Sequence, residues 1–228
     1  MIPLYLGFDP REEVGYHAFC SSVIARATEP VCFIPLDLKM LQKVYKGGQK
    51  DGTNAFIYSR FLIPYLQEFR GHAIFVDGSD MICKADIAEL WAMRNPWVAV
   101  QVVPHDYQTK FKRKYIGTGM EADNRDYPKK NWSSVMILNC AHYAWRNLRP
   151  TEIEAHSGEH LHQFRFILDR YIDFLPKEWN WLADEYGVNP DAKILHWTTG
   201  IPGFPYYSNA PHNGEWKLEH DRANYAIK

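Results

Sequence analysis

Two carboxylates follow a short apolar run in the first half of the chain. Residues 73–76 (Ala-Ile-Phe-Val) have the pattern of a buried strand, and Asp77 follows them directly, with Asp80 three residues later. We expect Gly78 and Ser79 to let the backbone turn, so that both carboxylates point into one crevice. Carboxylates at the carboxyl edge of a sheet suit a hard divalent ion such as Mn²⁺ or Mg²⁺. The alternative is a surface turn held by aspartate hydrogen bonds.

A histidine far along the chain is a candidate third ligand. His196 lies near the end of the apolar segment 193–197, which has the pattern of a strand. An imidazole there could complete the site of the two carboxylates. The alternative is a histidine that is hydrogen-bonded in the core or on the surface and binds no metal.

The first predicted strand, residues 4–8, ends at candidate contacts for a nucleotide. Phe8 and Asp9 could hold a base and a ribose there, with Arg11 near a phosphate. A structural interpretation is equally open. In it, Asp9 caps the helix that we expect to run to about residue 28, and Pro10 occupies its first turn.

One arginine interrupts an apolar helical pattern. Residues 56–69 carry apolar side chains at a helical period despite Pro64, and Arg60 is flanked by hydrophobic residues. Because this helix directly precedes the carboxylate strand, Arg60 is a candidate for a phosphate contact. A structural ion pair is the other interpretation.

Residues 108–130 have little periodicity and much charge, and we expect a long loop on the acceptor side of the site. The basic residues of this loop include Lys110, Lys112, Arg113 and Lys114. They form either a solvated face or a clamp for an acceptor or a phosphate. Asp106, His160 and Gln163 are further polar side chains that loops could bring to a sugar, and no residue identifies itself as a covalent nucleophile.

The segment from His156 to His160 matches His-x-x-Glu-His, the inverted motif of a class of zinc peptidases. Helical spacing would place His156 and His160 on one face as zinc ligands, with Glu159 as the base. Gly158 interrupts that helix, which we expect to continue to about Tyr171, and no second zinc-binding element is evident. A zinc peptidase is therefore a remote alternative.

Composition restricts the class of protein. The chain has 228 residues, 46% of them apolar, which suffices for one full-sized domain. Its formal net charge of −1 argues against a broad basic face for nucleic acid. Because no apolar run reaches the roughly 18 residues that span a bilayer, and the first residues lack a signal-peptide pattern, we expect a cytoplasmic protein. The four cysteines have no Cys-x-x-Cys spacing and are interpreted as buried thiols.

Strand and helix patterns alternate along most of the chain. Further strands are predicted at residues 31–36, 97–103 and 134–139, and further helices at 87–93 and 141–148. The expected fold class is α/β, with a single domain over residues 1–228, a mixed, mostly parallel central sheet and flanking helices. Residues from about 205 to 228 form a C-terminal extension.

Four segments, in this order, resemble the nucleotide-sugar glycosyltransferases of the GT-A fold. They are residues 7–12, residues 59–61, the carboxylate strand with its continuation at 86–91, and residues 175–180 followed by His196. The specific resemblance is to glycosyltransferase family eight, the group of glycogenin and the bacterial lipopolysaccharide galactosyltransferases. It covers most of the chain, to about residue 204.

The resemblance implies a metal-dependent transfer of a hexose from a UDP-sugar, with retention, to a saccharide, lipid-linked or other hydroxyl acceptor. Asp77, Asp80 and His196 would bind Mn²⁺ or Mg²⁺. The implied donor-binding residues are Phe8 and Asp9 at the uridine, together with Arg11, Arg60, Asp77, Ser79, Asn131, Ser133 and Gly200.

The chain departs from the family pattern in three places. Gly78 stands at the first acidic position, so either the turn bulges to let Asp77 coordinate or Asp80 alone touches the metal. Asn131-Trp-Ser-Ser leaves open whether Asn131 or Ser133 faces the sugar. Gly200-Ile-Pro-Gly lacks the lysine that would neutralise the diphosphate, and the basic residues 110–114, or Lys129 and Lys130, are the candidate replacements. A non-catalytic module that binds a nucleotide-sugar or a carbohydrate is therefore the alternative function.

Overall fold

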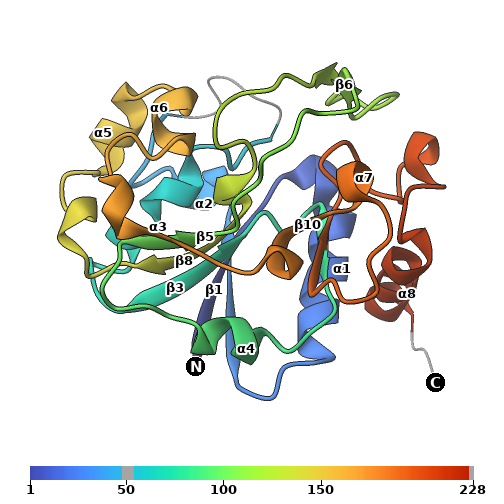
Figure 1. Ribbon diagram of the computed structural model, residues 1–228, viewed down its shortest axis with the longest axis horizontal. Helices are drawn as coiled ribbons and strands as arrows, with labels where there is room; N and C mark the ends of the chain where they lie inside the picture. Colours follow the sequence, from blue (N-terminus) through green and yellow to red (C-terminus); the bar gives the residue numbers. More distant parts are fainter. Residues whose placement is uncertain (48–53, 226–228) are drawn as a thin grey trace.

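A six-stranded sheet forms the centre of the molecule in the computed structural model, which describes residues 1–47 and 54–225 (Figure 1). In spatial order its strands are β2 (Val31–Leu36), β1 (Ile2–Gly7), β3 (His72–Val76), β8 (Val135–Asn139), β5 (Val100–Val102) and β9 (Ile172–Phe174). Neighbouring strands are parallel except at β8, which runs antiparallel to β3 and to β5. The predicted fold class, α/β with a mixed, mostly parallel sheet, is confirmed.

Apolar side chains cover both faces of this sheet, because successive residues of a strand point to opposite sides. On β1, Leu4 and Leu6 contribute to one core and Tyr5 contributes to the other. Helices α1 (Glu13–Ile24) and α4 (Ile87–Ala92) pack on the leucine side. Helix α1 ends four residues before the predicted residue 28, and α4 matches the prediction to within one residue.

Short helical segments cover the Tyr5 side of the sheet. They are η2 (Ser59–Leu62), α3 (Ile63–Leu66), η4 (Tyr143–Trp145), α5 (Pro150–Ala155) and α6 (Gly158–His162). The long helices predicted over 56–69 and 156–171 and the short helix predicted over 141–148 were wrong in length. Two of these segments are followed by residues with positive φ, which end the helix. They are Glu68 and Phe69 after α3, and Phe164 after α6.

A second sheet of three strands brings distant residues together. Its strands are β10 (Trp181–Leu182), β11 (Ile194–His196) and β4 (Met81–Cys83), of which β4 was not predicted. Strands β4 and β11 are antiparallel and pair Met81 with His196, and the Trp197 N–H donates to the Asp80 carbonyl at 2.9 Å. This ladder places the His196 strand beside the carboxylate turn.

The long loop predicted over 108–130 contains a short hairpin of β6 (Arg113–Lys114) and β7 (Ala122–Asp123). It is held by the segment after β11, because the Tyr115 N–H donates to the Thr199 carbonyl at 2.6 Å. The Ile116 N–H donates to the Tyr207 hydroxyl at 3.0 Å. The loop is therefore a folded part of the site's surroundings.

The C-terminal extension ends in helix α8 (Asn213–Asn224), which lies along α1 (Figure 1). The Arg26 guanidinium pairs with Glu219 at 2.7 Å across this contact. Residues 226–228 of the extension lie outside the described residues. No helix of the described chain is long and apolar enough to cross a membrane.

The remaining helical segments are short, and each joins two of the elements above. They are η1 (Pro10–Glu12), α2 (Leu38–Leu41), η3 (Trp132–Ser134), η5 (Asp169–Tyr171), η6 (Lys177–Asn180), α7 (Ala183–Tyr186) and η7 (Pro205–Tyr207). Cys83 and Cys140 are buried, Cys20 and Cys32 are partly buried, and all four are free thiols.

Candidate active site

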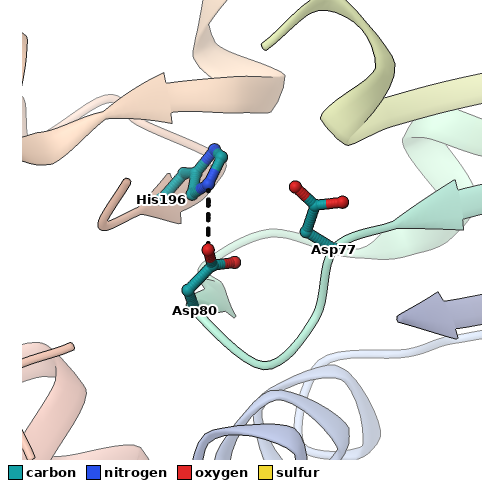
Figure 2. Close-up of side chains that lie close together, drawn as sticks. All are labelled: Asp77, Asp80 and His196. Carbon is teal, nitrogen blue, oxygen red and sulfur yellow. Dashed lines mark ion pairs between the residues drawn. The ribbon is translucent and has the colours of Figure 1, made fainter. Parts of the chain in front are cut away.

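Asp77, Asp80 and His196 converge on one point where β3 ends (Figure 2). One ligand atom of each residue lies within 4.8 Å of the others, and His196 Nε2 is 3.3 Å from Asp80 Oδ2. All three residues are buried. Within residues 1–47 and 54–225, these are the three His, Cys, Asp or Glu side chains close enough to share an ion.

The turn from Asp77 to Asp80 is fixed from several sides. The Asp77 N–H donates to the Ser134 carbonyl at 2.9 Å, and the Ser79 hydroxyl donates to the Gly7 carbonyl at 3.3 Å. Gly78 has a φ of +75°, which only glycine adopts without strain. Both carboxylates consequently face the same space, as the glycine and serine between them predicted.

An asparagine sets the orientation of His196. Asn180, which is fully buried, accepts a hydrogen bond at Oδ1 from His196 Nδ1, at 2.9 Å. Its amide nitrogen donates to His105 Nε2 at 3.0 Å and to the Asn131 carbonyl at 3.1 Å. This hydrogen bond leaves Nε2 as the ring nitrogen that faces Asp80, and Nε2 is the atom that would bind a metal in place of a proton.

Arg60 holds the other carboxylate. Its Nη1 lies 2.7 Å from Asp77 Oδ1 and donates to the Ser133 carbonyl at 2.8 Å, while the guanidinium lies over the Phe75 ring at 4.9 Å. Burial raises the pKa of Asp77, and the positive charge of Arg60 opposes that rise. The structure therefore supports the ion pair that was one of the two interpretations of Arg60.

The three side chains fit a divalent cation. Asp80 Oδ1 is buried and accepts no hydrogen bond from the described residues, so it has a free lone pair for a ligand. Burial alone would lower the pKa of His196, but the carboxylates of Asp80, Asp77 and Asp184 together outweigh burial and raise it. Two carboxylate oxygens and one imidazole nitrogen are a donor set suited to Mn²⁺ or Mg²⁺.

A pocket opens beside these ligands, and six of the predicted site residues line it. They are Arg60, Asp77, Asp80, Asn131, Ser133 and His196. Asn131 and Ser133, between which the sequence did not decide, both reach the pocket. Asn131 adopts a left-handed φ of +63° and donates from Nδ2 to the Tyr107 hydroxyl at 2.8 Å.

The predicted nucleotide contacts at the end of β1 lie outside this lining. Asp9 is buried and caps η1, where its Oδ1 accepts from the Arg11 N–H at 3.0 Å. The Arg11 guanidinium also lies 2.6 Å from Asp9 Oδ2, and the Phe8 ring packs edge-on against Tyr16. These contacts agree with the capping interpretation of Asp9 and Pro10, and a role in donor binding stays a prediction.

The other predicted residues are also outside the pocket lining. Ser79 is used in the turn, and Gly200 lets the backbone pass close to the Tyr207 ring, which a Cβ would approach to 2.4 Å. Asp106 is exposed. Gln163 Nε2 donates to Glu159 at 3.2 Å. Their roles in catalysis or binding stay predictions.

The helix assumed for the His-x-x-Glu-His segment is wrong. Helix α6 begins at Gly158, and His156 is the C-terminal cap of α5, so the two histidines do not lie on one helical face. The rings of His156 and His160 stack with centroids 4.0 Å apart, and Glu159 pairs with Arg165 at 2.6 Å. Glu159 is thus engaged by Arg165, and the two imidazoles are stacked rather than arranged as ligands on one helical face.

Several residues of the site were not predicted individually. His162 lines the pocket, with Nδ1 2.7 Å from the Ser133 hydroxyl, and burial lowers its pKa well below the usual value. Lys114 also lines the pocket. Asn180 was part of a motif used for the resemblance but had no role assigned, whereas His162 and His105 carried no signal in the sequence.

Comparison with known proteins finds a relative in sequence. No protein-family model matches the chain. The Arabidopsis thaliana protein named Protein CDI is 33% identical to this chain over an alignment of 232 residues. The alignment covers 97% of this chain and 86% of the plant protein. The chain belongs to the family of Protein CDI. This degree of identity over nearly the full length implies a shared fold for the two proteins.

Solved glycosyltransferases share the fold at low sequence identity. The bifunctional glycosyltransferase WbbM is 15% identical with a TM-score of 0.65, and GlyE of Streptococcus pneumoniae TIGR4 is 14% identical with a TM-score of 0.61. These matches cover 96% and 98% of this chain, but the chain spans only 49% and 62% of those proteins.

The galactosyltransferase LgtC, solved with donor and acceptor sugar analogs, is 11% identical with a TM-score of 0.53. That match covers 100% of this chain and 98% of LgtC. The fold is therefore the GT-A fold of the nucleotide-sugar glycosyltransferases, as the four sequence segments indicated, and it resembles the LgtC group.

Proposed function

We propose that this protein is a metal-dependent glycosyltransferase that moves a hexose from a UDP-sugar to an acceptor hydroxyl. The observation that carries the proposal is the convergence of Asp77, Asp80 and His196 at the edge of a GT-A sheet, beside a polar pocket. Ligands of open α/β sheets bind at the carboxyl ends of the strands, which is where β3 delivers Asp77.

Asp77, Asp80 and His196 would hold Mn²⁺ or Mg²⁺. When bound, the ion supplies positive charge that offsets the charge developing on the leaving diphosphate. Asn180 keeps the lone pair of His196 Nε2 directed at the site, and Arg60 fixes the Asp77 carboxylate. Preorganised ligands of this kind avoid rearrangement during the reaction.

The sugar would lie against Asn131, Ser133 and His162, the polar residues that line the pocket. Burial keeps the pKa of His162 low, so its imidazole is neutral at physiological pH and can exchange hydrogen bonds with sugar hydroxyls. Retention at the anomeric carbon is part of the proposal and rests on the resemblance to family eight. The acceptor would be a saccharide, lipid-linked or other hydroxyl compound that reaches the pocket from the side of the 108–130 loop.

The release of UDP from a panel of UDP-hexoses, with Mn²⁺ and with excess chelator, tests this function. We expect UDP release that requires the metal, and a loss of about 100-fold or more in Asp80→Asn and His196→Gln, which keep the size of each side chain. Asp191→Asn changes an exposed carboxylate that is not a candidate for the site and should retain activity.

Full activity in both Asp80→Asn and His196→Gln would refute the metal site. Tight, metal-dependent binding of a UDP-sugar by calorimetry, without turnover for any acceptor, would instead favour the non-catalytic binding module. Stoichiometric zinc that is lost in His156→Ala would favour the peptidase alternative, against the stacking of His156 on His160.

A further inference from the structure

Lys114 is a half-buried cation that has no ion pair or hydrogen bond among the described residues. It lies on β6 and lines the same pocket as Asp77, Asp80 and His196. Its Nζ lies 5.7 Å from the centroid of the Tyr115 ring. The end of the side chain is thus available to a ligand in the pocket.

The other basic residues of the loop are either paired with other groups or exposed to solvent. Arg113 pairs with Glu121 and Asp123, both at 2.9 Å, and Lys129 pairs with Asp169 at 3.1 Å. Lys130 donates to Asn124 at 2.8 Å. Lys110 donates to the Glu185 carbonyl, whereas Lys112 is exposed. Lys114 is therefore distinguished from its neighbours by its position in the pocket and by its free ammonium.

Burial lowers the pKa of Lys114, although the charges of Asp80, Glu12 and Asp77 act in the opposite direction. A cation in this position costs stability unless an anion meets it. Binding of a negatively charged ligand would offset this loss of stability. The environment of Lys114 is thus that of a ligand-binding group.

The backbone next to Lys114 is rigidly placed. The Tyr115 N–H donates to the Thr199 carbonyl at 2.6 Å, three residues beyond His196, and the Tyr115 hydroxyl accepts from Asn54 at 3.3 Å. Tyr115 is almost completely buried. Because the hairpin is tied to the segment that carries His196, Lys114 and the metal ligands keep a fixed relation.

The charges of the site leave a diphosphate without full compensation. A divalent ion would be balanced by Asp77 and Asp80, and Arg60 is already paired with Asp77. The diphosphate of a nucleotide-sugar carries about two negative charges, so a further cation is needed beside the ion. Two basic side chains line the described pocket, Arg60 and Lys114, and Lys114 is the one that has no ion pair.

We propose that Lys114 binds the diphosphate of the donor through its ammonium, and so makes the β6–β7 hairpin part of the donor site. This inference rests on the proposed function, because it requires a nucleoside diphosphate in the pocket. The role is one of binding and charge compensation, and no bond is made or broken at Lys114.

Calorimetry with UDP, GDP, ADP and CDP in saturating Mn²⁺ tests the inference on the full chain. We expect Lys114→Met to weaken the best-bound diphosphate by about 10- to 100-fold, the usual worth of a hydrogen bond between an ammonium and a phosphate. Lys114→Arg keeps the charge and should recover part of the affinity. Lys112→Met removes an exposed charge from the same loop and should bind like the wild type.

Binding of Mn²⁺ alone separates this role from a structural one. Lys114→Met removes a positive charge from the pocket, so Mn²⁺ should bind the variant at least as tightly as the wild type. The metal-free variant should not unfold at a lower temperature than the metal-free wild type. Equal diphosphate affinity in Lys114→Met and wild type would overturn this inference but leave the proposed function standing. A loss of Mn²⁺ affinity in Lys114→Met as large as its loss of diphosphate affinity would do the same. If the wild type binds none of the diphosphates with Mn²⁺, the inference and the proposed function both fail.

Discussion

Asn180 has a central position among the residues of the site, although it is not itself a candidate metal ligand. It connects His196 to His105 through a single amide, and it also donates to the Asn131 carbonyl. The three contacts use the whole amide: the oxygen accepts from His196, and the two N–H groups donate to His105 and to the Asn131 carbonyl. A residue of similar size without an amide cannot satisfy all three.

We expect Asn180→Ala to weaken Mn²⁺ binding by about 10- to 100-fold, because His196 loses the partner that fixes its tautomer and its orientation. Isothermal calorimetry with Mn²⁺ measures this. Asn147→Ala removes an exposed asparagine from another part of the surface and is the control. An unchanged Mn²⁺ affinity in Asn180→Ala would show that His196 needs no such support.

The sequence predicted the metal-ligand candidates better than the residues around them. Asp77 and Asp80 were recognisable because they follow an apolar strand, and His196 because it closes another. Their partners were not, since a hydrogen bond between Ser133 and His162, or between His105 and Asn180, depends on chain segments that meet only in the folded protein. Arg60 illustrates the difference: its position among hydrophobic residues was evident, but the sequence could not decide between its pairing with Asp77 and a phosphate contact.

Among the elements, α1 supports the carboxylate turn through close backbone contact. Gly15 lies against this turn, and a Cβ on Gly15 would lie 1.8 Å from the Ser79 carbonyl oxygen. No side chain larger than hydrogen fits there without displacement of α1 or of the turn. The position of α1 therefore helps to fix the separation of Asp77 and Asp80.

We predict that Gly15→Ala destabilises the protein by about 1–3 kcal/mol or more, through overpacking against backbone. It should also weaken Mn²⁺ binding, because the turn must shift. Urea unfolding and calorimetry measure the two effects. Gly214→Ala on α8 is the matched control, since a Cβ there meets nothing within 4 Å. Its stability should be unchanged or higher by up to about 1 kcal/mol.

A variant Gly15→Ala with the stability and the Mn²⁺ affinity of Gly214→Ala would mean that α1 and the turn adjust freely. The distance of 1.8 Å argues against this, because a carbonyl oxygen in a turn has less freedom to move than the end of a side chain.

The elements also show which structures a sequence pattern can predict. Strands β1, β2, β3 and β8 were found close to the predicted residues because each has five or six residues with a clear apolar pattern. Strand β4 has three residues, which are too few to show an alternating apolar pattern. It is formed by its pairing with β11. The helices predicted over 56–69 and 156–171 end early because the backbone has positive φ at Glu68 and at Phe164, which apolar spacing does not report.

For the whole molecule, the buried histidines make stability depend on pH. His105 is surrounded by Asn180 and Tyr186, and its Nε2 accepts the hydrogen bond of the Asn180 amide. Burial lowers the pKa of His105 to about 3, with smaller contributions from the charges of His196 and Lys177. The folded protein thus keeps this imidazole neutral at pH values where an exposed histidine is protonated.

The sign of the pH effect follows from this difference. In the unfolded chain His105 has a pKa of about 6.5, so below that pH the unfolded chain takes up a proton that the folded protein refuses. Acid therefore favours unfolding through His105: the loss begins as the pH falls through about 6.5 and is complete only below the folded pKa of about 3.

We predict that the loss of unfolding free energy between pH 7 and pH 5 is smaller by about 2 kcal/mol in His105→Gln than in the wild type. Urea titrations of both proteins at the two pH values measure it. The comparison is made within each protein, so the cost of breaking the contact with Asn180 cancels between the two pH values. Asn147→Gln changes an exposed side chain without an ionisable group and should leave the pH dependence of the wild type. An equal loss in wild type and His105→Gln would mean that His105 is not held neutral, and the hydrogen bond from Asn180 to its Nε2 would then be absent in solution.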